Sequence, residues 1–159
     1  IEILKDFRKR TGLDVILEPG SAFAWETGYL LSTIIDVVEN KGIKTAILDV
    51  SFAAHMPDCL EMPYKPKIVG SYFEPIKEKP TYRMGGNSCL SGDFVGDWSF
   101  DNELKPGDKI IFEDMIHYTM VKTTFFNGVT HPSIGSWNDN TGFRLIRKFG
   151  YNDFKGKLS

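Results

Sequence analysis

The sequence predicts a mainly β domain that follows a short α/β segment, and three observations support this prediction. Residues 1–17 combine an amphipathic helical pattern with a short apolar run. From residue 29 onward, β-branched and aromatic runs alternate with Gly, Pro and Asn turn signals. Aromatic residues make up 13% of the 159 residues, a length that gives room for one ordinary domain. The predicted units are residues 1–20 and residues 21–159.

The first unit is expected to be the end of an α/β fold. Ile3, Leu4 and Phe7 share one helical stripe, and Gly12 stands where a helix commonly stops. Residues 13–17 form an almost continuous apolar run, which is typical of a buried parallel strand. Because one strand cannot form a sheet, we expect its partner strands outside this sequence. The start at Ile1 rather than Met agrees with a piece of a longer protein.

The second unit is expected to be a β-sandwich or barrel of about seven strands. Residues 22–26 suggest a turn of helix, and the prolines between residues 57 and 66 suggest an irregular loop. Residues 40–42 read as a hairpin loop, residues 105–108 as a turn, and residues 152–159 as a fraying tail. The expected strands are residues 29–38, 45–50, 67–73, 81–84, 109–113, 117–126 and 143–149.

Composition excludes several classes of protein. Lys+Arg minus Asp+Glu is 19 − 21 = −2, which argues against a nucleic-acid or anionic-membrane surface. No apolar run approaches the roughly 18 residues of a membrane helix. Two cysteines thirty positions apart fit neither a disulfide scaffold nor a zinc site, and the three histidines lack metal-ligand spacing. We therefore expect no metal, free thiols and a cytoplasmic protein.

Glu18-Pro19-Gly20 follows the predicted buried strand, at the end where α/β folds build their sites. A carboxylate there can hold a protonated ligand nitrogen, and Gly20 lets backbone N–H groups approach a phosphate. The alternative interpretation is a strand end with a solvent-facing glutamate and a turn.

Residues 85–93 place Cys89 on a loop of glycines and serines, with Asp93 four residues later. A thiol in such a loop is a candidate for proton transfer, whereas a structural cysteine usually sits among apolar neighbours. The alternative is a hairpin loop with an incidental cysteine.

Two further segments carry weaker signals. Tyr118 enters a predicted β-run, where its hydroxyl can donate to a phosphate oxygen, although such a tyrosine is more often a core residue. His55 lies in the loop Ala54-His55-Met56-Pro57-Asp58, which alone indicates only a loop with a histidine.

Taken together, these segments resemble the C-terminal half of the fold type III (alanine-racemase-like) pyridoxal-phosphate decarboxylases. In that family a (β/α)8 barrel ends in a Glu-Pro-Gly strand. The β-domain that follows carries a Gly-x-x-Cys-x-x-x-Asp loop and a Tyr-Thr segment ending in Asn-Gly, which here are residues 86–93 and 118–128. Residues 48–64, with His-Met-Pro-Asp and Glu-Met-Pro-Tyr, look most similar to the carboxynorspermidine (carboxyspermidine) decarboxylase subfamily.

The resemblance implies a cofactor, pyridoxal 5′-phosphate, and residues that bind it. Glu18 would pair with the protonated pyridine nitrogen, which strengthens the ring as an electron sink. Gly20 and the Ser21 amide would face the cofactor phosphate, and the Tyr118 hydroxyl would donate to it.

The resemblance also implies a catalytic residue and a substrate, a polyamine carboxylate. Cys89 would come from the neighbouring subunit of a homodimer with shared active sites and would reprotonate the carbon that loses CO2. Asp93 could bind an ammonium group, and His55 would lie at the substrate end of the site.

This sequence departs from the family pattern in three ways. Ser21 replaces the Arg that many relatives carry, so a fixed charge near the phosphate is missing. Leu90 replaces the acid that ornithine- and diaminopimelate-type relatives carry after the cysteine, which leaves room for a longer polyamine. The cofactor-binding lysine is expected upstream of Glu18, and neither Lys5 nor Lys9 fits that role. We therefore expect the N-terminal barrel half to be missing and this chain alone to be inactive.

Two alternatives stay open. One is another decarboxylase of the same fold, for diaminopimelate, arginine or ornithine. The other is a non-catalytic β-domain that serves as a binding or dimerisation module, for which the missing lysine is the best argument.

Overall fold

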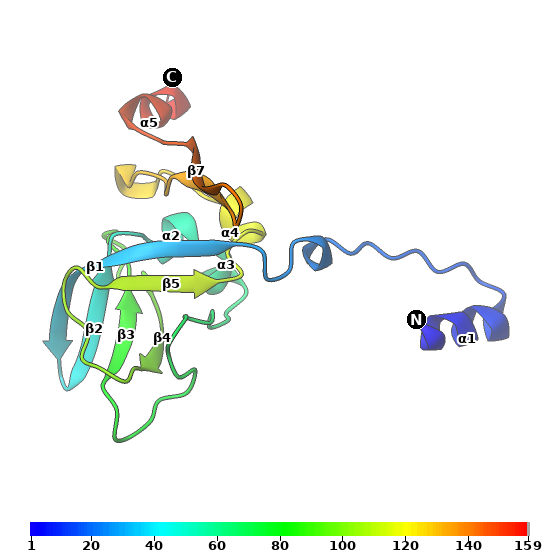
Figure 1. The fold of residues 1–159 in the computed structure, drawn as a ribbon, viewed down its shortest axis with the longest axis horizontal. Coiled ribbons are helices and arrows are strands. Elements are labelled where there is room, and N and C mark those ends of the chain that lie inside the picture. The colour runs from blue at the N-terminus through cyan, green and yellow to red at the C-terminus, as the bar shows by residue number, and fades with distance from the viewer. Residues whose placement is uncertain (159) are drawn as a thin grey trace.

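The structure is a computed structural model that describes residues 1–158 (Figure 1). The strands are β1 (Tyr29–Asn40), β2 (Ile43–Leu48), β3 (Thr81–Gly85), β4 (Phe94–Ser99), β5 (Lys109–Glu113), β6 (Ile134–Asn138) and β7 (Gly142–Arg147). The helical segments are α1 (Glu2–Thr11), η1 (Ser21–Phe23), α2 (Phe52–His55), α3 (Asp58–Glu61), α4 (Tyr118–Val121), η2 (Phe126–Gly128) and α5 (Tyr151–Leu158). The predicted mainly β class is confirmed.

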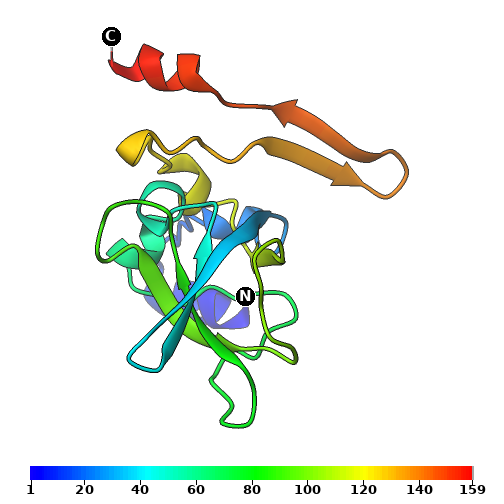
Figure 2. The ribbon, with the colours of Figure 1, turned by 90° about the vertical axis from the view of Figure 1, so that its left-hand side faces the viewer.

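Five strands form one sheet in the order β4-β3-β2-β1-β5, and β6 and β7 form a separate hairpin. In Figure 2 this hairpin and α5 project beyond one end of the sheet. The predicted hairpin between β1 and β2 is confirmed, since Lys41 (φ 50°) and Gly42 (φ 78°) take the left-handed conformations that a two-residue turn requires.

The turn at residues 105–108 is also confirmed, and it docks β5 against β1. Gly107 (φ 96°) donates its N–H to the Ile34 carbonyl at 2.8 Å, and the Asp108 carbonyl accepts from the Ile34 N–H at 2.9 Å. Strand β5 then pairs antiparallel with the first half of β1. Strand β5 is therefore the edge strand of the sheet on the side opposite β4.

One strand pair differs from the rest, because β2 and β3 run parallel. A parallel pair needs a long crossover, here residues 49–80, which carries α2 and α3. Strands β3 and β4 are antiparallel, so residues 86–93 form the connection between two neighbouring strands. We call residues 86–93 the cysteine loop.

The core lies between the sheet and the crossover. Phe52 of α2 packs edge-to-face on Phe112 of β5, with ring centroids 5.8 Å apart. Burial of each such large side chain contributes about 2–3 kcal/mol. The largest fully buried side chains include Trp98, Tyr82, Phe52, Phe112, Ile34 and Leu48.

Helix α1 forms as predicted and ends at Gly12 (φ 71°), whose N–H donates to the Arg8 carbonyl at 2.9 Å. The strand predicted over residues 13–17 is not formed; Leu13, Ile16 and Leu17 are exposed in an extended segment. Among residues 1–158 no strand lies beside this segment to supply hydrogen-bond partners. Figure 1 shows α1 standing apart from the sheet. The division of the chain at residue 20 stays a prediction.

Two other predicted strands are wrong. Residues 67–73 make only isolated bridges at Ile68 and Tyr72, and residues 117–126 instead hold α4 and the start of η2. Strands β4 and β6 were not predicted, and the tail expected to fray contains α5. None of the helices formed by residues 1–158 combines the length and the hydropathy of a membrane-spanning segment.

Candidate functional site

The predicted site residues fall into two clusters. Cys89, Asp93 and His55 gather around the cysteine loop and α2, whereas Ser21 and Tyr118 line one cavity beside α3. Glu18 and Gly20 lie in the exposed segment that leads to η1. In the described part of the chain, no group of three or more His, Cys, Asp or Glu side chains is arranged to hold a metal ion.

Asp93 organises the cysteine loop from its buried side. Its carboxylate is 5% exposed; Oδ1 accepts from the Ala53 N–H at 2.9 Å. Oδ2 accepts from both the N–H and the hydroxyl of Ser88, at 3.1 and 2.6 Å. Three donors thus satisfy a buried charge, and they join the loop to the first turn of α2.

Gly86 is required by this arrangement. A Cβ on residue 86 would lie 2.2 Å from Asp93 Oδ2 and 2.5 Å from its Cγ. The Gly86 N–H also donates to the Asp93 carbonyl at 2.7 Å. Only glycine lets the backbone approach the carboxylate this closely.

Cys89, in the middle of the cysteine loop, carries the exposed thiol of the chain. Its N–H donates to Asn127 Oδ1 at 3.3 Å. The second cysteine, Cys59, is buried, and burial raises the pKa of its thiol to about 11, which makes it inert. The structure therefore offers Cys89, and not Cys59, for chemistry with a ligand.

His55 is the last residue of α2 and is 2% exposed. Its Nδ1 accepts from the Ser51 N–H at 3.1 Å. Burial, and then the neighbouring His131, lower its pKa to about 4, so the ring is neutral at neutral pH. Nε2 has no hydrogen-bond partner among residues 1–158. The substrate contacts predicted for His55 and for Asp93 stay predictions.

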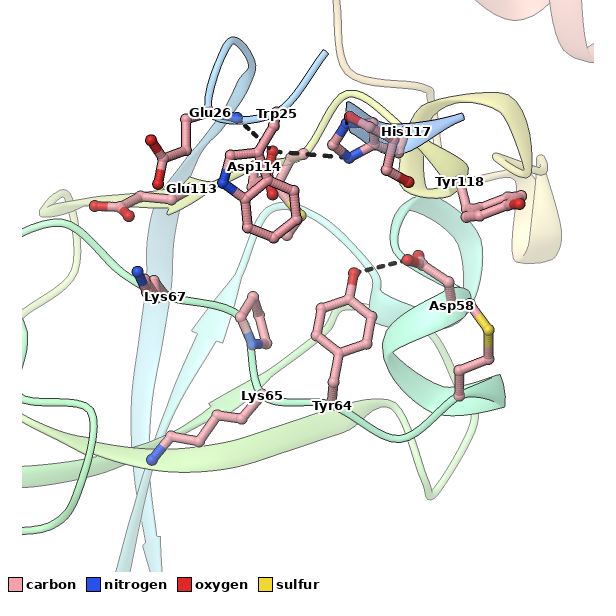
Figure 3. A pocket seen from close by; sticks show the side chains of 14 residues that line it. Trp25, Glu26, Asp58, Tyr64, Lys65, Lys67, Glu113, Asp114, His117 and Tyr118 are labelled. Atoms are coloured by element: carbon pink, nitrogen blue, oxygen red, sulfur yellow. Dashed lines mark hydrogen bonds and ion pairs between the residues drawn. The ribbon is translucent and has the colours of Figure 1, made fainter. Parts of the chain in front are cut away.

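Ser21 and Tyr118 share the wall of a cavity of about 390 Å³, which we call the tyrosine cavity (Figure 3). Tyr118 is 54% exposed, so its hydroxyl is available to a ligand. The cavity is lined by Ser21, Trp25, Glu26, Asp58, Met62, Tyr64, Lys65, Pro66, Lys67, Glu113, Asp114, Met115, His117 and Tyr118.

His117, next to Tyr118, connects the segment around Ser21 with Asp114 on the rim of the tyrosine cavity. Its Nε2 donates to the Ser21 carbonyl at 3.1 Å, and its ring stacks on Trp25. Its Nδ1 lies 3.7 Å from Asp114 Oδ1, which also accepts from the Glu26 N–H at 3.0 Å. This contact was not predicted, because a strand was expected over residues 117–126; the Tyr-Thr segment directly after His117 was the signal that could have found it.

A hydrogen bond between the half-exposed Tyr64 and the buried Asp58, which also line the tyrosine cavity, was missed from the sequence. The Tyr64 hydroxyl donates to Asp58 Oδ2 at 2.7 Å, as Figure 3 shows. Burial, and then this hydrogen bond, raise the pKa of Tyr64 far above its ordinary value. Both residues stand in the segment that carries the subfamily resemblance, but spacing alone does not reveal that they meet.

Comparison with known proteins shows which family this chain is similar to. The family described as "Pyridoxal-dependent decarboxylase, C-terminal sheet domain" matches residues 15–116. The chain is 54% identical over 159 residues to carboxyaminopropylagmatine decarboxylase of Synechocystis sp., covering 99% of this chain and 41% of that protein. It is 40% identical over 164 residues to carboxynorspermidine/carboxyspermidine decarboxylase of Campylobacter jejuni, covering 97% and 43%.

Among solved structures, carboxynorspermidine decarboxylase of Campylobacter jejuni complexed with norspermidine matches with a TM-score of 0.84 and 38% identity. The match covers 98% of this chain and 45% of that one. The chain thus spans less than half the length of these relatives. The family model covers more than half of the chain, and the structural match extends over nearly all of it. The chain therefore belongs to the pyridoxal-dependent decarboxylases, whose C-terminal sheet domain it contains.

Proposed function

We propose that this chain is the C-terminal part of an enzyme that decarboxylates a carboxylated polyamine. Carboxynorspermidine and carboxyspermidine are the substrates that the sequence favours. The name of the Synechocystis relative adds carboxyaminopropylagmatine. All three names describe a carboxylated, amine-rich chain, and Leu90 beside Cys89 leaves no acid for the shorter diamino acid substrates. The enzyme is proposed to act in the cytoplasm.

The residues of this chain fit pyridoxal 5′-phosphate, the cofactor of the family. The exposed Tyr118 hydroxyl and Ser21 stand on the same cavity and can donate to a phosphate. The Glu18 carboxylate is exposed three residues before Ser21 and can hold a protonated ring nitrogen. When bound, the cofactor supplies the electron sink for loss of CO2. We propose that the lysine that anchors it lies upstream of Glu18.

The observation that carries the proposal is the placement of Cys89. Its thiol is exposed on a loop whose base is fixed by a buried carboxylate. A thiol held in this way can deliver a proton to the substrate carbon from which CO2 has left. In the proposed homodimer, Cys89 serves the site of the neighbouring subunit, and Tyr118 serves the site of its own.

The test uses the full-length enzyme, or this chain co-expressed with an N-terminal barrel half. Cys89→Ala should keep the visible absorbance of the bound cofactor and slow steady-state turnover to the product amine about 100-fold or more. Cys59→Ala, the matched control, should keep its turnover. Unchanged turnover in Cys89→Ala would remove the thiol from the mechanism. Faster CO2 release from diaminopimelate than from the three carboxylated polyamines would contradict the substrate assignment.

A further inference from the structure

We propose that Asn127 is a positioning residue for Cys89, and that α2 is the common anchor of both. The inference rests on the proposed role of Cys89 as the proton donor. Asn127 lies 38 residues beyond Cys89, on the segment that begins at Tyr118.

Asp93 holds both neighbours of Cys89 but not Cys89 itself: its carboxylate accepts from Ser88, and its N–H donates to the Leu90 carbonyl at 3.0 Å. The contacts of the Asp93 carboxylate are to Ala53 and Ser88, and none reaches Cys89 itself. Among residues 1–158, the hydrogen bond of the Cys89 N–H is the one to Asn127 Oδ1, at 3.3 Å. In the described chain, Asn127 thus supplies the one hydrogen bond that acts on the Cys89 backbone N–H directly, between two neighbours that Asp93 holds.

Asn127 is itself held in an unusual conformation. It has φ 58° and ψ 13°, in the left-handed region that Asn tolerates better than most residues. Gly128 follows with φ 71° and donates its N–H to the Phe125 carbonyl at 2.8 Å. This sharp turn, built from the Asn-Gly pair, directs the amide oxygen to the cysteine loop.

Helix α2 contacts both the cysteine loop and the segment that carries Asn127. The Ala53 N–H donates to Asp93 at 2.9 Å, and the next residue, Ala54, accepts at its carbonyl from the Thr124 N–H at 2.8 Å. Two successive residues of α2 thus fix the cysteine loop and the segment that carries Asn127. The thiol is placed by a closed set of contacts and not by the loop alone.

Two substitutions separate the hydrogen bond from the backbone conformation. Asn127→Gly removes the acceptor but keeps a residue that adopts positive φ without strain. Asn127→Asp keeps both an acceptor oxygen and tolerance of the left-handed region. Asn102→Gly, at an exposed position away from the loop, controls for the introduction of a glycine.

The experiment measures amide hydrogen exchange of the Cys89 peptide, together with kcat and KM, in the full-length enzyme. For Asn127→Gly we expect exchange at Cys89 about fivefold faster, as loss of one ordinary hydrogen bond implies. We expect kcat to fall about fivefold or more, with KM within about twofold. Asn127→Asp should restore the slow exchange, and Asn102→Gly should behave as the parent.

Unchanged exchange at Cys89 in Asn127→Gly would overturn the inference, and so would faster exchange with an unchanged kcat. A change confined to KM would assign Asn127 to substrate binding and would overturn it as well. The proposed function is judged separately by Cys89→Ala, whose turnover does not depend on Asn127. Failure of one proposal is therefore distinguishable from failure of the other.

Discussion

Replacement of Gly86 by alanine tests the buried clamp of the cysteine loop most directly. The new methyl group would lie 2.2 Å from Asp93 Oδ2 and 2.6 Å from Oδ1. Carbon and oxygen atoms that are not bonded do not approach within 3.0 Å, so the carboxylate has to move by most of an ångström. Asp93 is 5% exposed, and it has no free space into which to move without losing its donors.

The cost follows from the hydrogen bonds at stake. Asp93 accepts from the Ala53 N–H, the Ser88 N–H and the Ser88 hydroxyl. A hydrogen bond to a charged group contributes about 1.5–3 kcal/mol, so loss of two of the three costs about 3 kcal/mol or more. This is a large part of the stability of an ordinary domain.

Gly92 in the same loop is the matched control. A Cβ there would meet nothing within 4 Å, and its φ lies outside the left-handed range. Alanine at this position should change the free energy of unfolding by less than about 1 kcal/mol, in the stabilising direction. The assay is guanidinium unfolding of the full-length enzyme, followed by tryptophan fluorescence. Equal midpoints for Gly86→Ala and Gly92→Ala would refute the reasoning.

Two further predictions concern buried polar groups. Because the pKa of His55 is about 4 when folded and near 6.5 when unfolded, the unfolded chain binds more protons between these values. Stability should therefore fall as the pH falls from about 6.5 to about 4, by up to ~1.4 kcal/mol per pH unit. Urea unfolding at pH 7 and pH 5 measures this, and a slope that persists in His55→Gln would assign it to other groups. Tyr64→Phe removes the hydrogen-bond donor to the buried Asp58 carboxylate and should lower the free energy of unfolding by about 2–3 kcal/mol. Tyr72→Phe, the control, loses a hydrogen bond to the exposed Asp101 and should lower it by less than about 1 kcal/mol. Similar losses in thermal unfolding for the two tyrosine variants would show that the Tyr64 bond has no special weight.

The turns of the fold were predicted correctly from the sequence, because the residue types within a turn decide its backbone conformation. The Lys41-Gly42 turn and the turn that ends at Asp108 have residue types that only a few backbone conformations accept, and both were predicted correctly. The helical turn in residues 117–126 was not predicted. Their aromatic and β-branched composition favours a strand, but only where a neighbouring strand is available to pair with it. Here the His117 carbonyl accepts from Met120 and Val121 in a helical turn, and no strand of the described chain lies beside it.

The same division holds for the site. The spacing of Cys89 and Asp93 within one loop, together with the family resemblance, predicted that both belong to it. Neither the contact with Asn127 nor that with Ala53 was predictable, because each joins residues about 40 positions apart through the folded sheet. The hydrogen bond from Tyr64 to the buried Asp58 was missed because it depends on how the crossover folds back on itself, which spacing does not reveal.

The parallel pairing of β2 with β3 has a consequence for how such a domain can change over time. A hairpin loop is constrained by the register of its two strands, so an inserted or deleted residue shifts the sheet. The crossover between β2 and β3 is not bound by a shared register at its ends, which lie at opposite ends of the sheet; within it, Ile68 and Tyr72 bridge to the sheet. It also supplies α2, whose Ala53 N–H binds the Asp93 carboxylate of the cysteine loop, and it supplies α3 and Tyr64, which line the tyrosine cavity. Substitutions in residues 49–66, and length changes that leave the bridges at Ile68 and Tyr72 in place, can therefore alter ligand preference while the five strands keep their pairing.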